Sequence, residues 1–272
     1  MKYFDPENKQ LIYISQESTS HFWDGFWCDF SALPAEFLTL NNTFVSRITK
    51  KYVGPTDGVV LEGGCGMGQY VASLVNSGYN TIGVDYARNT LNELKHCAPS
   101  YDLVAGDVRT LPFLDNSFVA YWSLGVIEHF WAGYYDIASE MYRVLKDGGY
   151  LFVTFPYMSP LRVKRVRRGL YQPWLDRLAP KGFHQFALNS ELVIRNFSGL
   201  GFELIETIPH DAATGMEDEL RPSRFFLQKL LDFAPHHRFV GFLETIFEKL
   251  FAHFSGHCML LVMRKGAQVL RI

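Results

Sequence analysis

Cysteines, an imbalance of charge and long apolar runs are all scarce in this sequence. The 272 residues include four cysteines, and no two of them form a CxxC pair: Cys28, Cys65, Cys97 and Cys258. That spacing matches no zinc-binding motif, so we expect no metal site. No stretch of about 18 apolar residues occurs, which argues against a transmembrane helix.

The charge balance is also close to neutral. The formal net charge is −2 and the pI is about 6.5. The chain therefore lacks the basic footprint of a nucleic-acid-binding protein, and only a local patch could contact a membrane surface. Residues 1–10 are polar and lack the apolar centre of a secretory leader. We expect a soluble protein of a reducing compartment, with the cytoplasm as its location.

Aromatic side chains and a regular alternation of elements are what the chain has in excess. Aromatic residues make up 15% of it. Between residues 59 and 156, segments of helical spacing alternate with short apolar runs, which are Val59–Leu61, Thr81–Val84, Asp102–Ala105, Phe118–Trp122 and Tyr150–Phe155. Near-continuous apolar strands alternating with helices are typical of a parallel sheet covered on both faces.

The segments around this core are less regular. We expect a helix that begins after Leu33, with Pro34 in its first turn, and a helix end capped at 147–149. A further helix is expected over 190–200. The chain reads as one domain, 1–272, composed of an N-terminal cap segment (1–54), a cofactor-binding core (55–156) and two substrate-side cap insertions (157–189 and 213–256).

The strongest local signal is a glycine-rich turn after a strand and before a helix, Glu62-Gly63-Gly64-Cys65-Gly66-Met67-Gly68. Glycines let the backbone turn sharply and let a ligand come close. The dinucleotide fingerprint GxGxxG fails, because Gln69 stands where its third glycine belongs. The turn could be only a tight connection, but the acid at its start suits a ligand with a cationic group.

Two more carboxyl groups follow the next strands. Asp85 ends the second strand and Asp107 follows the third. An acid at the first position can bind both hydroxyls of a ribose, and an acid at the second can accept from an exocyclic amine. Each could instead cap a helix. Because parallel strands end at one edge of the sheet, the three acids predict a single ligand crevice.

Taken in order, these segments resemble a known family. The stretches VVLEGGCGMGQYV, TIGVDYA, LVAGDVRTLPF, SFVAYWSLGVIEHF and RVLKDGGYLFVTFP are similar to motifs of the Rossmann-like S-adenosylmethionine-dependent methyltransferases. The likeness is strongest to the group that includes the ubiquinone and menaquinone biosynthesis methyltransferases. It covers about residues 55–210. It implies a Rossmann-like, doubly wound α/β fold, with a mostly parallel sheet of about seven strands, the last one antiparallel.

The resemblance also implies S-adenosylmethionine as cofactor and a set of residues that bind it. Those residues are Glu62, Gly63, Gly64, Gly66 and Gly68 for the amino-acid part, Asp85, Tyr86, Asp107 and Val108 for the ribose and adenine, and Ser123, Leu124 and Gly125 beneath the sulfonium. Transfer of the methyl group is an in-line displacement, in which the enzyme mainly orients the reactants and excludes water.

A hydroxyl acceptor would also need a base. His129, just beyond the fourth strand, is the catalytic candidate, because imidazole titrates near neutrality. It could equally be a structural or substrate-positioning histidine. Glu128 and His184 are weaker candidates for the same role.

Three features bear on the methyl acceptor. Five of the eight residues 161–168 are basic, which suits a solvated helix face, an anion site or a membrane contact. The segment 239–254 is predicted to be an amphipathic helix that packs on the core, joins two chains in a homodimer or forms a lid. Trp23 and Trp27 could close over the cofactor. We expect a small-molecule acceptor, apolar or anionic.

Other functions are compatible with this pattern. A non-catalytic sensor or partner-binding subunit could keep the fold, and an aminopropyl transferase or a nicotinamide dehydrogenase could use it. The intact set of glycines and acids favours a cofactor-binding enzyme. The failed dinucleotide fingerprint argues against the dehydrogenase.

Overall fold

The computed structural model describes residues 1–28, 39–220 and 238–266. Its main sheet has seven strands, and β11 alone runs against its neighbours β7 and β10. Their spatial order is β10 (Phe202–His210), β11 (Cys258–Lys265), β7 (Leu145–Pro156), β6 (Phe118–Leu124), β3 (Val59–Gly63), β4 (Asn80–Asp85) and β5 (Asp102–Ala105). The predicted Rossmann-like sheet, with its last strand antiparallel, is confirmed.

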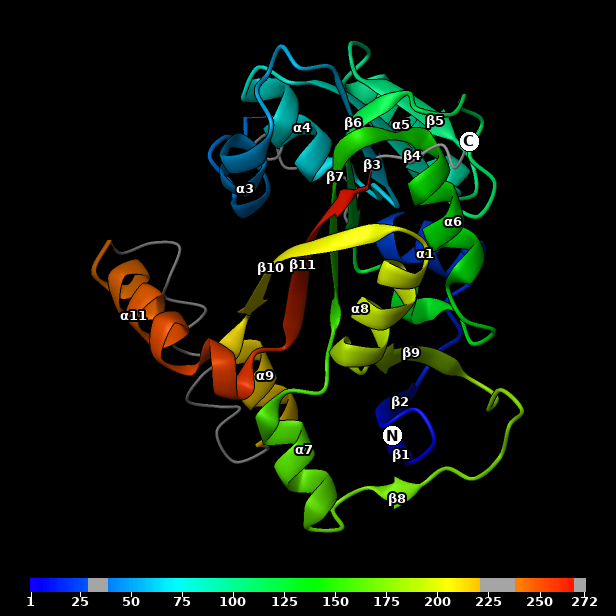
Figure 1. Cartoon of the computed structure of the whole chain (residues 1–272), viewed down its shortest axis with the longest axis vertical. Coiled ribbons are helices and arrows are strands. Elements are labelled where there is room, and N and C mark those ends of the chain that lie inside the picture. Colours follow the sequence, from blue (N-terminus) through cyan, green and yellow to red (C-terminus); the bar gives the residue numbers. More distant parts are fainter. Residues whose placement is uncertain (29–38, 221–237, 267–272) are drawn as a thin grey trace, which may run out of the picture.

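Helices cover both faces of this sheet (Figure 1). The helices around the sheet are α3 (Phe44–Tyr52), α4 (Gln69–Asn76), α5 (Arg88–Cys97), the short 3-10 helix η1 (Ile127–His129), α6 (Tyr135–Val144) and α8 (Ser190–Gly199). Because neighbouring side chains of a strand point to opposite faces, Trp122 packs with α3 and α4 on one side, and Tyr121 packs with α6 on the other. The buried Trp122 indole donates to Thr49 Oγ1 of α3 at 2.8 Å, so its polar atom is satisfied.

A second, four-stranded sheet lies beside the core and was not predicted. Its order is β8 (Gln172–Pro173), β1 (Lys2–Asp5), β2 (Gln10–Ile14) and β9 (Phe183–Ala187). The sequence predicted an N-terminal cap segment over 1–54 and a cap insertion over 157–189 in place of these strands. The hairpin of β1 and β2 instead pairs with β9, and Phe183, Phe186 and Trp131 pack beneath it.

One predicted boundary is wrong, and another lies outside the described residues. The start of a helix after Leu33, with Pro34 in its first turn, falls among residues 29–38, which the structure does not describe. Further along the chain, α3 begins at Phe44, where the Thr43 side chain accepts from the Ser46 N–H and caps the helix. Helix α6 ends at Val144, and the expected cap at 147–149 belongs to β7, because the strand extends further back along the chain than its apolar run.

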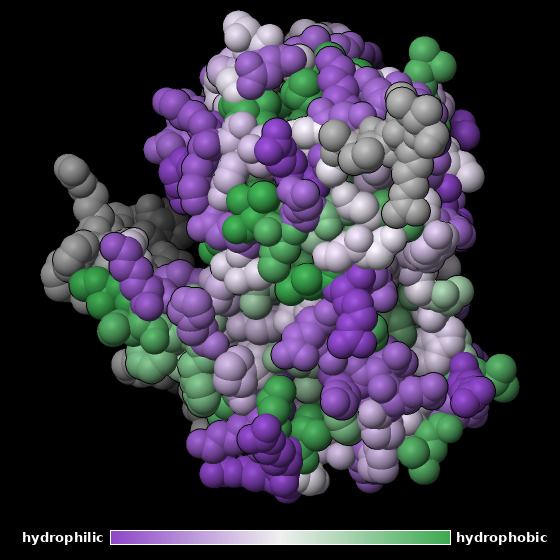
Figure 2. Space-filling view, in the orientation of Figure 1, coloured by the Kyte–Doolittle hydropathy of each residue, from purple (hydrophilic) through white to green (hydrophobic). Residues whose placement is uncertain are grey.

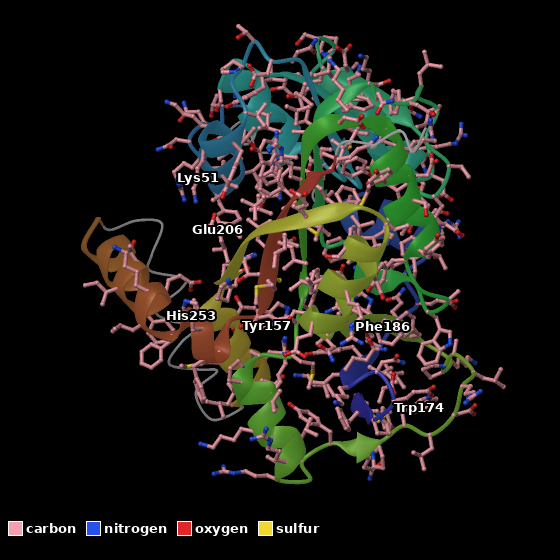
Figure 3. The ribbon with its side chains drawn as sticks, in the orientation of Figure 1. Lys51, Tyr157, Trp174, Phe186, Glu206 and His253 are labelled. Carbon is pink, nitrogen blue, oxygen red and sulfur yellow. The ribbon has the colours of Figure 1, made fainter. Side chains whose placement is uncertain are left out.

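Of the remaining helices, α7 and α9 lie at the lower end of the molecule in Figure 1, α11 lies at its left side, and α1 lies near the middle, close to α6. They are α1 (Ser20–Cys28), α7 (Pro160–Arg167), α9 (Ala212–Glu219) and α11 (Arg238–Ser255). The predicted amphipathic helix is α11, which projects from the body and exposes apolar side chains such as Leu250, at 68% (Figure 2). Figure 3 shows Lys51 of α3 facing Glu206 of β10, a pair 2.6 Å apart. Within the described part of the chain, no helix has the length and apolarity to cross a bilayer.

A buried arginine joins α7 to α9. Arg162 is fully buried, and its guanidinium lies 3.0 Å from Asp218 and 3.1 Å from Glu219. Lys2 of the hairpin pairs with the same two carboxylates. Burial raises the pKa of Asp218, but Lys2 and Arg162 together hold it down at about 2. Arg165 also pairs with Glu219, so two of the five basic residues of 161–168 are already neutralised.

Replacing Arg162 should therefore destabilise the whole fold. Arg162→Ala removes a fully buried counter-charge from the Asp218 and Glu219 carboxylates, and we expect the free energy of unfolding to fall by about 3–5 kcal/mol. Urea unfolding followed by circular dichroism measures this. Arg167→Ala, on the exposed side of the same helix, is the control and should change stability by less than about 0.5 kcal/mol. Equal effects of the two variants would contradict a structural role for Arg162.

Candidate active site

A cavity of about 400 Å³ lies at the carboxyl ends of β3, β4, β5 and β6. The predicted site residues that line it are Gly64, Gly66, Asp85, Tyr86, Asp107, Val108, Leu124, Gly125 and His129. The predicted residues Glu62, Gly63, Gly68 and Ser123 do not line it. Residues that the sequence analysis did not place here are Ser18, Gly106, Arg109, Val126 and Phe130. Of the three acids predicted to share one crevice, Asp85 and Asp107 line this cavity and Glu62 does not.

The glycine turn between β3 and α4 is held by backbone geometry that other residues rarely adopt. Gly64 has φ of 80° and Gly68 has φ of 69°. A Cβ at Gly64 would lie 2.5 Å from the Val126 side chain, and one at Gly68 would lie 2.4 Å from Leu94. The turn therefore requires glycine at both positions. Gly68 lets the start of α4 pack closely against Leu94 of α5, whereas Gly64 lines the cavity.

Glu62 lies at the end of β3, just before this turn, and is 1% exposed. Its Oε2 is buried and has no hydrogen-bond partner among the described residues. Burial, followed by the charge of Asp85, raises the pKa of its carboxyl well above the usual range, although the Val71 N–H donates to it. A buried carboxyl with a spare oxygen is costly unless a partner arrives. It suits a ligand that brings a positive charge.

Asp85 ties the glycine turn to the end of β4. Its Oδ2 accepts from the Gly66 N–H and its Oδ1 from the Ala87 N–H, both at 2.8 Å. Burial raises its pKa, and these amides oppose that rise. Each carboxylate oxygen can still accept a second hydrogen bond. Asp85 therefore supports the turn and keeps acceptor capacity for ligand hydroxyls.

Asp107 already has a partner. Arg109 grips it with two nitrogens, and the shortest contact, from Nη2 to Oδ2, is 2.6 Å. Hydrogen bonding from Arg109 lowers the pKa of Asp107. The Arg109 guanidinium also lies over the Phe130 ring, 5.4 Å from its centre. Any ligand amine bound by Asp107 must share that carboxylate with Arg109, which the sequence analysis did not include in the site.

Helix α1 forms one wall of the cavity. Trp23 and Trp27 stack with ring centres 6.0 Å apart, and both line the hollow. Asp24, between them, accepts from the N–H groups of Asn89 at 3.2 Å and Thr90 at 3.4 Å. These are the first amides of α5, whose own capping position, Ala87, offers no side-chain acceptor. Asp24 thus caps a helix 65 residues away in the sequence, which fixes α1 over the cavity.

His129 is buried and held in one orientation. Its Nδ1 lies 2.7 Å from the His184 carbonyl oxygen and 3.1 Å from Ser18 Oγ. A carbonyl oxygen only accepts, so Nδ1 carries the ring proton and Nε2 carries the lone pair. Burial lowers the pKa of His129 to about 4, so the imidazole is neutral near pH 7. The Trp23 ring packs edge-on against it, with centres 5.1 Å apart.

Glu128, the alternative base, is 2% exposed and lies off the cavity. Its Oε2 has no partner among the described residues. Burial raises its pKa to about 8. A protonated carboxyl cannot act as a base near neutral pH, so the structure favours His129 over Glu128 for that role.

Comparison with known proteins agrees with this geometry. Residues 61–153 match the methyltransferase domain family. These residues are a methyltransferase domain. They span β3 to the middle of β7 and include the glycine turn, Asp85, Asp107 and His129. One of the curated relatives below is named as a probable S-adenosylmethionine-dependent methyltransferase.

Curated relatives share the methyltransferase domain over part of their length. A probable S-adenosylmethionine-dependent methyltransferase of Mycolicibacterium smegmatis is 31% identical over 150 residues, covering 55% of this chain and 53% of the relative. Demethylmenaquinone methyltransferase of Corynebacterium efficiens is 36% identical over 138 residues, covering 50% and 56%. The chain spans about half the length of these relatives.

Solved structures share the fold over nearly the whole chain. An S-adenosylmethionine-dependent methyltransferase from Methanosarcina mazei has a TM-score of 0.53 at 16% identity, covering 84% of this chain and 99% of that one. The cyclase SpnF has a TM-score of 0.54 at 17% identity, covering 94% and 98%. At such identities the likeness concerns the fold alone, and a cyclase shows that this fold also occurs outside methyl transfer.

Removing the Asp85 carboxylate should weaken the binding of S-adenosylhomocysteine. Asp85→Ala takes away a charged acceptor and the anchor of the Gly66 amide. We expect the affinity for S-adenosylhomocysteine to fall by at least about 1 kcal/mol, or about fivefold, in isothermal titration calorimetry. Asp102→Ala, an exposed acid at the opposite end of β5, is the control. An unchanged Kd in Asp85→Ala would reject the assignment.

The raised pKa of Glu128 should appear in the pH dependence of stability. An unfolded glutamate ionises at about pH 4.3, whereas folded Glu128 holds its proton up to about pH 8. The contribution of the protonated Glu128 carboxyl to the free energy of unfolding is complete below the pKa of the unfolded state. It is lost as the pH rises towards and through the pKa of the folded state. The wild-type free energy of unfolding, relative to that of Glu128→Gln, should therefore fall by up to about 1.4 kcal/mol per pH unit across this window.

The measurement is urea unfolding at intervals between pH 5 and about pH 9. Glu93→Gln, on the exposed face of α5, is the matched control and should leave the wild-type curve unchanged. Parallel curves for wild type and Glu128→Gln would show that Glu128 titrates normally.

Proposed function

We propose that this chain transfers the methyl group of S-adenosylmethionine to a small, mainly apolar acceptor. The observation that carries the proposal is a buried carboxyl oxygen of Glu62 that has no partner among the described residues; Glu62 directly precedes the glycine turn, whose Gly64 and Gly66 line the cavity. The amino-acid part of the cofactor carries an ammonium group, and Glu62 offers a counter-charge to that group. A non-binding protein of this fold would have no use for such a costly group.

The residues present fit this cofactor. Glu62 and the glycine turn would hold its amino-acid part, Asp85 its ribose, and Tyr86, Asp107 and Val108 its adenine. Leu124 and Gly125 would lie beneath the sulfonium, with Ser123 buried behind them. When bound, the cofactor supplies an electrophilic methyl group on a positively charged sulfur.

The chain's own side chains perform the rest of the work. Trp23, Trp27 and Phe130 exclude water from the cavity and present aromatic faces, which stabilise a cationic centre. His129 Nε2 accepts the proton of a hydroxyl acceptor, because Nδ1 is committed to the His184 carbonyl. The fixed, neutral imidazole would also orient the acceptor hydroxyl for attack on the methyl group, which needs no charge on the ring.

The acceptor is argued from the described cavity lining. Arg109 is the one basic side chain there apart from His129, and Asp107 already pairs with it. His129 is neutral, so the described wall offers no spare cation to an anionic acceptor. Trp23, Trp27, Val126 and Phe130 give it an apolar character instead. This favours the apolar alternative from the sequence analysis over the anionic one.

Calorimetric titration of the purified chain tests the proposal at its first step. S-adenosylmethionine and S-adenosylhomocysteine should each release or absorb heat and raise the melting temperature. Acceptor-dependent formation of S-adenosylhomocysteine, screened over apolar hydroxyl and amine compounds, tests the second step. No binding of either nucleoside would reject the function, and binding without any turnover would favour the non-catalytic alternative.

Loss of the His129 imidazole should slow turnover of a hydroxyl acceptor. We expect His129→Ala to lower kcat about 100-fold, the usual contribution of a positioned base. Because the pKa of His129 lies at about 4, wild-type kcat should stay level from neutral pH down to about pH 5 and fall below it. Steady-state rates measured across this pH range test both expectations, with His96→Ala on exposed α5 as control. Wild-type turnover in His129→Ala would leave His129 a structural role.

A further inference from the structure

A second group of chemically reactive side chains lies at the same edge of the sheet, outside the cavity. His210 is the last residue of β10, Asp211 follows it, and Cys258 is the first residue of β11. His210 and Cys258 are direct partners across the two strands, and Cys258 also faces Pro156 at the end of β7. One donor atom from each of the three side chains lies within 4.8 Å of the other two.

The hydrogen bonding of this group is incomplete. His210 Nδ1 lies 3.0 Å from Asp211 Oδ2, while His210 Nε2 is buried and has no partner in the described part of the chain. Glu248 of α11 reaches the same place: its Oε2 accepts from the Ala212 N–H at 2.8 Å. Its Oε1 is buried and likewise lacks a described partner. Two buried polar atoms that metal ions commonly bind, an imidazole nitrogen and a carboxylate oxygen, therefore lack a described partner, and Glu248 is held at Ala212, the residue that follows Asp211.

We propose that His210, Asp211 and Cys258, completed by Glu248, bind a divalent cation of the zinc class. Imidazole, thiolate and carboxylate are the donors that zinc takes in proteins, and a sulfur donor disfavours magnesium and calcium. Metal–donor distances of about 2.0–2.3 Å place the donors about 3–4 Å apart, so the observed group needs only a small contraction. The Asp211 side chain is about half exposed, which gives the ion a way in.

The proposed ion would fasten elements that the polypeptide joins only through long connections. His210 ends β10, Cys258 begins β11, and Glu248 belongs to α11. Tyr157, labelled in Figure 3, lies at the end of β7, and its hydroxyl reaches the Ala252 carbonyl of α11 at 3.5 Å. The ion would add a bond of much greater strength at this junction, beside the exposed apolar face of α11. This role goes beyond methyl transfer and does not depend on it.

Cobalt(II) is the spectroscopic probe. Titration of the metal-free chain should produce a near-ultraviolet thiolate-to-cobalt charge-transfer band and the visible bands of a tetrahedral site, both lost on adding zinc. Cys258→Ser should abolish the charge-transfer band. Cys97→Ser, which removes an exposed cysteine, is the matched control and should leave it unchanged. Absence of the band in wild type, or its survival in Cys258→Ser, would overturn the proposal.

Zinc titration calorimetry apportions the other ligands. We expect His210→Ala to raise the Kd at least 100-fold, and Glu248→Gln and Asp211→Asn to raise it about 10-fold or more. Affinity should also increase with pH, because the thiol releases its proton on binding. A zinc Kd unchanged in His210→Ala or in Asp211→Asn would contradict the ligand set, and an unchanged Kd in Glu248→Gln would remove Glu248 from it.

Binding of S-adenosylhomocysteine by each variant shows that the domain remains folded. Since Asp211 is largely at the surface, Asp211→Asn keeps the question open to measurement even where His210→Ala unfolds. Zinc binding without nucleoside binding would reject the proposed function and leave the metal site standing. Nucleoside binding without zinc binding would reject the metal site and leave the proposed function standing.

Discussion

Burial of carboxyl groups at one edge of a parallel sheet is the constraint on which this molecule depends. Parallel strands bring their ends together, and here those ends carry Glu62, Asp85 and, just beyond, Glu128. Each acid is excluded from water. Backbone amides pair with Asp85, Glu128 retains its proton, and one oxygen of Glu62 and one of Glu128 lack a partner among the described residues. A buried acceptor costs free energy until something pairs with it, and of these two acids it is Glu62 that directly precedes the glycine turn lining the cavity. The fold brings the strand ends to one edge of the sheet, and the unpaired carboxyl oxygen of Glu62 at that edge is the basis of the proposed ligand site.

The parts of this architecture that repeat locally were predictable from the sequence. Apolar runs such as Val59–Leu61 and Phe118–Trp122 identified the parallel strands, since strands buried on both faces must be apolar throughout. The glycine turn and Asp85 were predictable for a similar reason: strand, turn and acid lie within a short stretch of chain. That neighbourhood is enough to place them at one edge.

Contacts between distant segments were not predictable. Ser18, His129 and His184 meet although they lie up to 166 residues apart, and no spacing in the sequence encodes that meeting. Nothing in the sequence around Asp24 indicates that it caps α5, because the Asn89 and Thr90 amides meet it only in the folded structure. The same holds for His210, Asp211 and Cys258: a motif search looks for ligands close in sequence, whereas these are brought together by the pairing of β10 with β11. The second sheet was missed because β1 and β2 are short and have little periodicity to detect.

The cap that Asp24 gives to α5 couples two events that otherwise look separate. Any movement that lifts α1 from the cavity must take Asp24 away from the Asn89 and Thr90 amides, which then face water at the bare end of a helix. Exchange of ligand and fraying of the first turn of α5 therefore share one energetic step. Hydrogen exchange of the Asn89 and Thr90 amides therefore reports how often α1 leaves the cavity, and in the proposed function that opening would also limit the release of the bound nucleoside.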